Sequence, residues 1–202
     1  MQRLNTLNRQ FTPNSNFNGG QVGPKRDDDI VIVGMARTAM TKAKRGPQAN
    51  TAVEAMLKPV LQAVHKQSGI DTALVDDICI GNVIMAGSAA TNHRISMFLA
   101  DYPETTSVMA INRLCSSGLQ AVATVANAIK AGQINIGIGG GVETMSNGNM
   151  QATVDANLLD ESIFDHPKAR DCLMPMGITS ENVAAQYGVT REEQDTLAFE
   201  SH

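Results

Sequence analysis

Short apolar blocks alternate with turn residues through the middle of this 202-residue chain. Four blocks are rich in β-branched residues or glycine, a pattern typical of buried strands, and they lie at residues 30–38, 77–84, 106–112 and 134–143. The intervening stretches carry apolar residues at helical spacing, which predicts helices over 51–67, 92–100 and 115–131. This alternation predicts an α/β domain with a largely parallel or mixed sheet.

Capping residues and helix breakers set the ends of the predicted helices. Thr51 and Glu54 have the spacing of a capping box, and Gly69 follows the last apolar position of the same helix. Pro59 lies inside this helix and predicts a kink. Gly132 is the expected stop of the helix over 115–131.

The pattern changes after residue 145. Residues 145–178 hold few periodic segments, and we expect a long loop over the surface there. Two short helices should follow, the first ended by Gly188 and the second opened by a capping box of Thr190 and Glu193. The chain stops inside this last helical pattern without a capping residue, so we interpret the sequence as truncated.

The first 26 residues differ in composition from the rest. They carry four basic residues and no acidic one, whereas all 20 acidic residues lie further along the chain. Residues 12–26 are rich in Asn, Gly and Pro, which is typical of a linker. We therefore divide the chain into a targeting leader and linker at 1–28, a domain at 29–144 and a truncated loop or lid region at 145–202.

Composition excludes several classes of function. The sequence contains no run of 18 apolar residues, so we expect no membrane span. Three cysteines without regular spacing predict neither a disulfide framework nor a metal site. The net charge of −4 and an aromatic content of 3% offer neither a basic surface nor stacking platforms, so nucleic acid is not an expected partner.

Cys115 stands at the start of the predicted helix over 115–131, behind a short polar run. The thiolate is the nucleophilic form of cysteine, and the positive end of a helix dipole together with unpaired first-turn N–H groups stabilises it. Ser116, Ser117 and Gly118 would keep the first turn narrow, so that a ligand carbonyl could approach the backbone. Position alone leaves open a second interpretation, that Cys115 is a small buried apolar residue.

At this point the motifs become recognisable as those of a family. The stretch "INRLCSSGLQAV" resembles the active-cysteine signature of the thiolases, the enzymes that cleave 3-ketoacyl-CoA with a second CoA. Other blocks occur in the family's order: "VIVGMARTA", "IGNVIMAG", "GGGVETMSN" and "LMPMGITSENVAAQYGVTREEQDTLA". The resemblance extends from about residue 29 to the last residue. It implies the thiolase fold, with this chain as the layered α/β/α half of a five-layered αβαβα sandwich that has a mixed sheet, plus part of the lid region.

The resemblance also implies roles for particular residues. Cys115 matches the nucleophile that carries the acyl group as a thioester, and its backbone N–H matches one oxyanion donor. Met176 and Gly177 match a methionine-glycine block that lines the acyl-CoA pocket. The family's general base, a histidine in a Gly-His-Pro motif, and its second cysteine belong to a second half that this sequence does not contain, and none of His65, His93, His166 and His202 matches the base.

We therefore expect an acetyl-CoA C-acyltransferase that cleaves 3-ketoacyl-CoA to acetyl-CoA and a shortened acyl-CoA in fatty-acid β-oxidation, with this chain inactive by itself. The expected partners are acyl-CoA, CoA as co-substrate and a second copy in a homodimer, with no further cofactor and no metal. Two alternatives stay open: an acetoacetyl-CoA thiolase working in the condensing direction, and a non-catalytic fragment that binds acyl-CoA or a thiolase subunit.

The leader gives a hypothesis about location. Five of its positions are similar to the N-terminal peroxisomal targeting nonapeptide: Arg3, Leu4, Leu7, Gln10 and Phe11. This spacing predicts recognition by a peroxisomal import receptor. Mitochondrial presequences share the basic, acid-free character, so the mitochondrion is the alternative location.

Several further positions have a structural interpretation, in most cases beside a functional one. Glu143 could be an acid/base group, although we favour a carboxylate that orders neighbouring backbone. The glycines of "GIGGGVE" could form a nucleotide loop, but they follow no strand–turn–helix arrangement with an acidic residue about 20 positions on, and we favour close packing of a helix on the strand. Cys79 is expected in the core. Asn92 and Arg94 either reach a partner subunit or begin a solvated helix.

Overall fold

The computed structural model describes residues 26–148 and 154–201. The leader positions Arg3, Leu4, Leu7, Gln10 and Phe11 lie outside the described residues. Contacts divide the chain into two compact units, residues 1–150 and 151–202, which we describe separately. Among the described helices, none is both long and apolar enough to cross a bilayer.

The first unit is built on a three-stranded sheet. Its strands are β1 (Asp77–Gly81), β2 (Ser107–Ile111) and β3 (Gly137–Gly141), in the order β2-β1-β3. Both pairs are parallel, because a crossover that contains a helix joins β1 to β2 and β2 to β3. The α/β class is confirmed. The described strands are all parallel, however, where a mixed sheet was expected.

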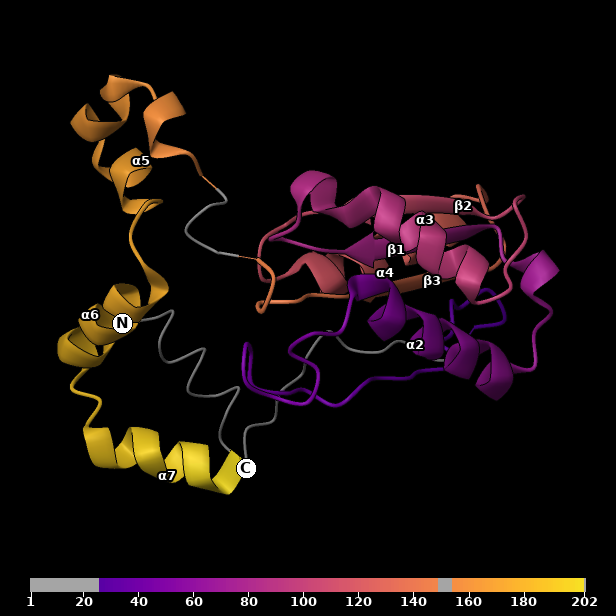
Figure 1. Cartoon of the computed structure of the whole chain (residues 1–202), viewed down its shortest axis with the longest axis horizontal. Helices are drawn as coiled ribbons and strands as arrows, with labels where there is room; N and C mark the ends of the chain where they lie inside the picture. Colours follow the sequence, from indigo (N-terminus) through magenta and orange to yellow (C-terminus); the bar gives the residue numbers. More distant parts are fainter. Residues whose placement is uncertain (1–25, 149–153, 202) are drawn as a thin grey trace. The chain divides into compact units, whose positions relative to one another are not determined.

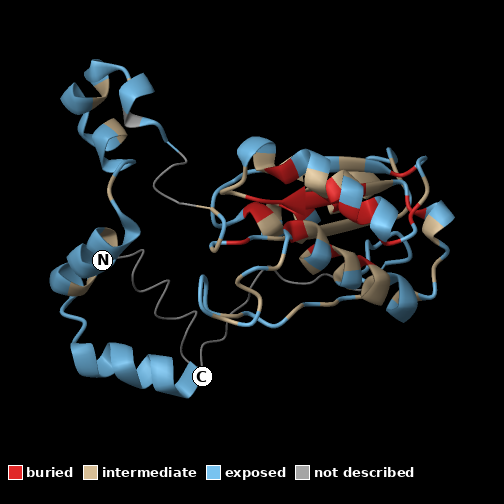
Figure 2. Ribbon diagram, viewed as in Figure 1, coloured by how far each residue is buried: buried red, intermediate tan, exposed pale blue. Residues whose placement is uncertain are grey.

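Helices cover both faces of this sheet (Figure 1). The helices α2 (Val53–Ser68) and α3 (Ala90–Leu99) lie on one face, and α4 (Ser117–Lys130) lies on the other. The alternating side chains of β1 divide accordingly: Ile78 and Ile80 pack with α2 and α3, whereas Cys79 packs with α4. The result is an α/β/α layering with buried residues on both sides of β1 (Figure 2).

In the first unit the predicted glycine stops at the C-terminal ends of the helices are confirmed, but the predicted N-terminal capping box is not. Gly69 follows α2 with φ of 67°, and Gly132 lies just after α4 with φ of 71°. The predicted capping box at the start of α2 is wrong, because the helix is capped by Ala52 without a side-chain bond and the Glu54 carboxylate accepts a hydrogen bond from the Asn92 amide on α3. Packing against α3 has replaced the local bond. Pro59 lies inside the helix, which continues through it.

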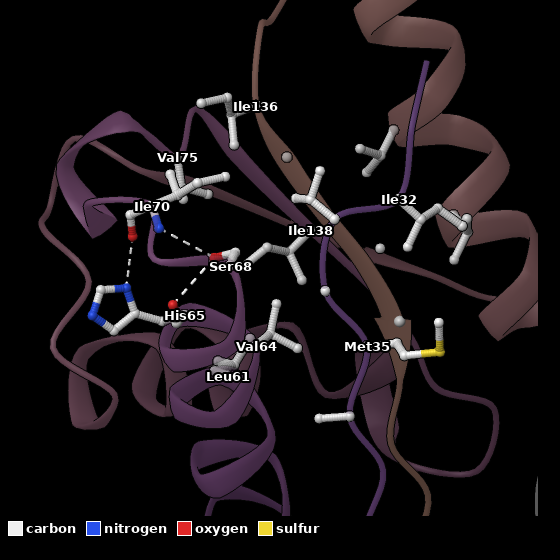
Figure 3. A pocket seen from close by; sticks show the side chains of 18 of the residues that line it. Ile32, Met35, Leu61, Val64, His65, Ser68, Ile70, Val75, Ile136 and Ile138 are labelled. Carbon is white, nitrogen blue, oxygen red and sulfur yellow. Dashed lines mark hydrogen bonds between the residues drawn. The ribbon is translucent and has the colours of Figure 1, made fainter. Parts of the chain in front are cut away.

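The predicted strand over 30–38 is not part of the sheet. The segment is extended and runs beside β3, but a cavity of about 330 Å³ lies between them (Figure 3). Its backbone bonds to α2 instead, since the Met35 N–H donates to the Gln67 side chain at 3.0 Å. Without a hydrogen-bonded neighbour the segment leaves apolar side chains exposed, among them Val31, Ile32 and Val33 at 69%, 74% and 60%. The strand pattern identified an extended segment, but it did not determine whether that segment would approach the open edge of β3 closely enough to pair.

The second unit is a chain of short helices. It contains η4 (Ala156–Leu158), η5 (Glu161–Asp165), α5 (Pro167–Asp171), α6 (Met176–Tyr187) and α7 (Arg191–Ser201). The capping box that opens α7 is confirmed, with the Thr190 N–H donating to Glu193 at 2.8 Å and the Glu193 N–H to the Thr190 hydroxyl at 3.2 Å. Gly188, with φ of 68°, ends α6 as predicted.

The long loop expected over 145–178 is partly helical. Asp155, Asp160 and His166 each cap a short helical turn with a side-chain acceptor. These local bonds form helical turns that lack the apolar period, so periodicity could not reveal them. None of the described residues in this unit is buried, so its helices have no core of their own (Figure 2).

Candidate active site

Cys115 lies in the short connection between β2 and α4. The residue is exposed and precedes the first residue of α4 by two positions, with Ser116 as the helix cap. The predicted placement at a helix N-terminus is therefore confirmed, although the helix begins two residues later than the sequence suggested. The alternative interpretation, a buried apolar cysteine, is wrong.

The turn that presents Cys115 contains a strained residue. Leu114 has φ of 49°, in the left-handed region that costs a non-glycine residue about 1–2 kcal/mol. The Asn112 side chain accepts a hydrogen bond of 2.9 Å from the Leu114 N–H, and the Ser117 hydroxyl donates to the Leu114 carbonyl at 2.6 Å. The Arg113 N–H in turn donates to the Ser117 hydroxyl at 2.8 Å. Local side-chain bonds thus maintain the conformation.

Two glycines allow α4 to lie directly on the sheet. A Cβ at Gly81, the last residue of β1, would come within 2.6 Å of the Ser117 backbone, and one at Gly139 in β3 within 2.6 Å of the Cα of Val122. Real Cβ atoms do not approach other atoms so closely, so only glycine permits this contact. The close-packing interpretation of the "GIGGGVE" glycines is confirmed. By contrast, a Cβ at Gly118 would meet nothing within 4 Å, so the first turn of α4 is open.

A cavity of about 750 Å³ adjoins the Cys115 turn. It is bordered by the loop after the extended segment, by the ends of β1 and β3, and by the first turn of α4. Methionines contribute to the wall, since Met40, Met56 and Met145 line it. Flexible thioethers suit a pocket for an apolar chain. No histidine of the described chain lines the cavity, so a general base of that type is not supplied here.

Glu143 borders the same cavity, and four hydrogen bonds hold its carboxylate. One oxygen accepts the N–H groups of Val83 at 2.9 Å and Ile84 at 3.2 Å. The other accepts the Thr144 N–H and the Asn82 amide, each at 3.2 Å. A carboxylate offers about four acceptor positions, and all are used here. Glu143 therefore orders backbone, as we favoured, and has no free lone pair for proton transfer.

The other two cysteines differ from Cys115. Cys79 is completely buried against Ala121 and Val125, as expected for a core residue. Burial, with a smaller contribution from Asp77, raises the pKa of its thiol to about 11, so the thiolate is suppressed. Cys172 is exposed in the second unit, where its thiol donates to the Lys168 carbonyl at 3.3 Å.

The remaining sequence-predicted site residues lie in the second unit. Met176 and Gly177 are the first two residues of α6, and both are exposed. A role for these two residues beside Cys115 stays a prediction. Within the described residues, no group of three or more His, Cys, Asp and Glu side chains is placed to hold a metal ion.

Asn92 and Arg94 make their contacts within the chain. Asn92 donates to Glu54 on α2. Arg94 donates to the carbonyls of Thr106 and Glu104 and lies 4.7 Å above the ring of Phe98. The interpretation of Asn92 and Arg94 as the solvated start of a helix is therefore wrong, because both side chains bind other elements of the first unit.

His93 is a buried residue that sequence reasoning did not single out. It is 1% exposed, and neither ring nitrogen has a hydrogen-bond partner among the described residues. Burial lowers its pKa to about 4, although the nearby Glu54 charge opposes the shift. The available signal was its position four residues before Met97, on the buried face of α3.

Comparisons with known proteins show the family to which the chain belongs. The family description "Thiolase, N-terminal domain" matches residues 30–202. The peroxisomal 3-ketoacyl-CoA thiolase of Yarrowia lipolytica is 45% identical over 204 residues, which cover 100% of this chain and 48% of the relative. The chain therefore spans about half the length of the curated relatives it matches.

Two solved structures from Saccharomyces cerevisiae resemble the chain. The dimeric peroxisomal thiolase has a TM-score of 0.78 and 37% identity, covering 86% of this chain and 45% of its own. A second structure, of the peroxisomal 3-ketoacyl-CoA thiolase, has a TM-score of 0.58 and 36% identity, covering 64% and 39%. It is described as a five-layered α-β-α-β-α structure built from two core domains of identical topology. The chain belongs to the thiolase family, and residues 30–202 match its N-terminal domain.

Proposed function

We propose that this chain is the N-terminal half of a peroxisomal 3-ketoacyl-CoA thiolase, in which Cys115 is the nucleophile. One observation carries the proposal: Cys115 is exposed at the N-terminal end of α4, beside a cavity of about 750 Å³ with methionines in its wall. The names of the relatives supply the substrate class and the peroxisomal location. These names favour thiolytic cleavage over the condensing reaction.

The reaction has two group-transfer steps. The Cys115 thiolate attacks the keto carbon of 3-ketoacyl-CoA, and the bond between that carbon and C2 breaks. Its electron pair stays on C2, and the resulting enolate takes a proton to give acetyl-CoA. The thiolate of a second CoA then attacks the thioester on Cys115, which releases the shortened acyl-CoA and restores the thiolate.

This chain would supply only part of that machinery. The positive end of the α4 dipole and the open first turn at Gly118 favour a developing oxyanion beside Cys115. The base and the proton donor for the enolate would come from the second half of a thiolase, so we expect no turnover from the chain alone. We also infer homodimer formation, in line with the dimeric yeast thiolase, and import through Arg3, Leu4, Leu7, Gln10 and Phe11.

Trapping of the acyl group tests the proposal. The full-length protein incubated with 3-ketoacyl-CoA without free CoA should gain the mass of one acyl group, located on Cys115 by peptide mass spectrometry. Cys115→Ser should remove this adduct, whereas Cys172→Ser, at the other exposed cysteine, should retain it. An adduct that persists in Cys115→Ser would reject the assignment.

A further inference from the structure

The carboxylate of Glu143 and the thiol of Cys115 are joined by a continuous path of hydrogen bonds and backbone. Glu143 binds the peptide N–H groups of Val83 and Ile84, in the loop after β1. The carbonyl of the same residue, Val83, accepts a hydrogen bond of 3.2 Å from the Asn112 side-chain amide. The loop is thus held from both sides, by Glu143 after β3 and by Asn112 after β2.

Asn112 extends the path to the turn before Cys115. Its amide nitrogen donates to Val83 while its carbonyl oxygen accepts the N–H of Leu114, the strained left-handed residue. One side chain therefore couples the position of the loop to the conformation of Leu114. Movement of the loop would turn the amide of Asn112 and break one of the two side-chain bonds that maintain Leu114, leaving only that of Ser117. Cys115 is the next residue in the chain.

We propose that Glu143 is a positioning residue for Cys115, which acts through the Asn82–Ile84 loop and Asn112 to keep the thiol facing the cavity. This inference rests on the proposed function, because it assigns Glu143 a role in presenting the nucleophile. The cavity supports it, since Asn82, Val83, Ile84, Leu114, Cys115 and Glu143 all line it. Three of the four donors to the Glu143 carboxylate, from Asn82, Val83 and Ile84, lie about sixty residues before it in the chain.

The same unit contains a matched control carboxylate. Asp76 accepts the N–H groups of Asn135 at 2.7 Å and Ile136 at 3.1 Å, just before β3 begins. These bonds hold the pKa of Asp76 below its ordinary value. Asp76 thus orders backbone as Glu143 does, but at the opposite end of β3 and outside the cavity. If Glu143 did no more than order the backbone beside it, Asp76→Asn and Glu143→Gln should have similar effects.

The experiment measures the alkylation rate of each cysteine in the full-length protein with iodoacetamide at neutral pH, by peptide mass spectrometry. Cys172, the other exposed cysteine, is the internal standard in every sample. Glu143→Gln keeps the side-chain shape but turns an NH₂ group toward backbone donors. We expect the Cys115 rate relative to Cys172 to fall about tenfold in this variant and kcat of thiolysis to fall with little change in KM. Asp76→Asn should leave the rate ratio unchanged.

A double-variant cycle separates a relay from two independent effects. Asn112→Ala should lower the Cys115 rate like Glu143→Gln, and the combined variant should be no slower than the worse single one, because both break the same path. Unchanged Cys115 alkylation in folded Glu143→Gln, or multiplicative losses in the double variant, would overturn the proposal. If Glu143→Gln fails to fold, Asn112→Ala decides by itself, and an unchanged rate ratio there would also overturn it. The alkylation assay uses no substrate, so it tests the positioning role independently of catalysis. If the wild-type protein formed no acyl adduct in the trapping experiment, the proposed function would be rejected whatever the alkylation rates are.

Discussion

The end of β1 touches the beginning of α4 at Gly81 and Ser117, with no room for a side chain between them. An ideal Cβ at Gly81 would lie 2.6 Å from the Ser117 backbone carbon. Ser117 is 4% exposed. Its hydroxyl accepts a hydrogen bond from the Arg113 N–H and donates one to the Leu114 carbonyl, both in the turn that presents Cys115. The position of the thiol therefore depends on a backbone contact between elements about thirty-five residues apart.

Replacement of Gly81 should displace this contact. Gly81→Ala is expected to cost about 1–3 kcal/mol in the free energy of unfolding, because strand or helix must shift to admit the methyl group. Urea denaturation measures the loss, and Cys115 alkylation should slow in the same variant. Gly118→Ala is the control, since its added Cβ meets nothing within 4 Å. Equal destabilisation by both changes would contradict the close contact.

The buried imidazole of His93 should make stability depend on pH. Its pKa is lowered to about 4 in the folded chain, whereas an unfolded histidine titrates near 6.5. Between these values the unfolded state binds a proton that the folded state does not. Stability is therefore unaffected above pH 6.5, falls as pH drops from about 6.5 to about 4 by roughly 1.4 kcal/mol per unit, and then levels off.

His93→Leu should remove this acid dependence and raise stability at neutral pH, because no unpartnered ring nitrogens remain buried. Urea midpoints at pH 7.5, 6, 5 and 4.5 give the comparison. His166→Gln removes an exposed ring that caps α5 in the second unit, so it controls for the loss of a histidine that is not buried. A wild-type stability that follows His93→Leu at every pH would disprove the prediction.

Arg94 should contribute more to stability than an exposed arginine in an ion pair. Its guanidinium binds two carbonyls before β2 and lies on Phe98, so Arg94→Ala leaves carbonyl groups without their donor and should cost about 1–3 kcal/mol. Among the described residues Arg191 forms an ion pair only with Asp195, and the two side chains are exposed at 82% and 59%. Arg191→Ala should change thermal stability less, and high salt should reduce even that difference.

The three cysteines should separate by reactivity. Cys79, which is buried and has a pKa raised to about 11, should resist iodoacetamide at neutral pH until the protein unfolds. Cys115 and Cys172 are both exposed, and the helix dipole behind Cys115 should make it the faster of the two. Time-resolved peptide mass spectrometry measures all three at once. A Cys115 no faster than Cys172 would remove the physical basis for its role as nucleophile.

Local sequence determined most of the elements of the first unit and the place of Cys115. Apolar period, glycine stops and β-branched runs predicted α2, α3, α4 and the three strands, because these features act between residues close in the chain. The capping box of Thr190 and Glu193 formed as expected for the same reason. The motif around Cys115 is also a short, continuous stretch, so the amino-acid sequence was sufficient to indicate the family.

The tertiary structure decided what depends on residues far apart in sequence. Glu54 bonds to Asn92 on α3 and does not form the predicted capping box. Residues 30–38 are outside the sheet, because a cavity separates them from the open edge of β3. The four bonds of Glu143 and the buried ring of His93 likewise arise from packing between elements. Propensity and periodicity are short-range quantities, whereas hydrogen-bond partners and burial are fixed only when distant segments meet.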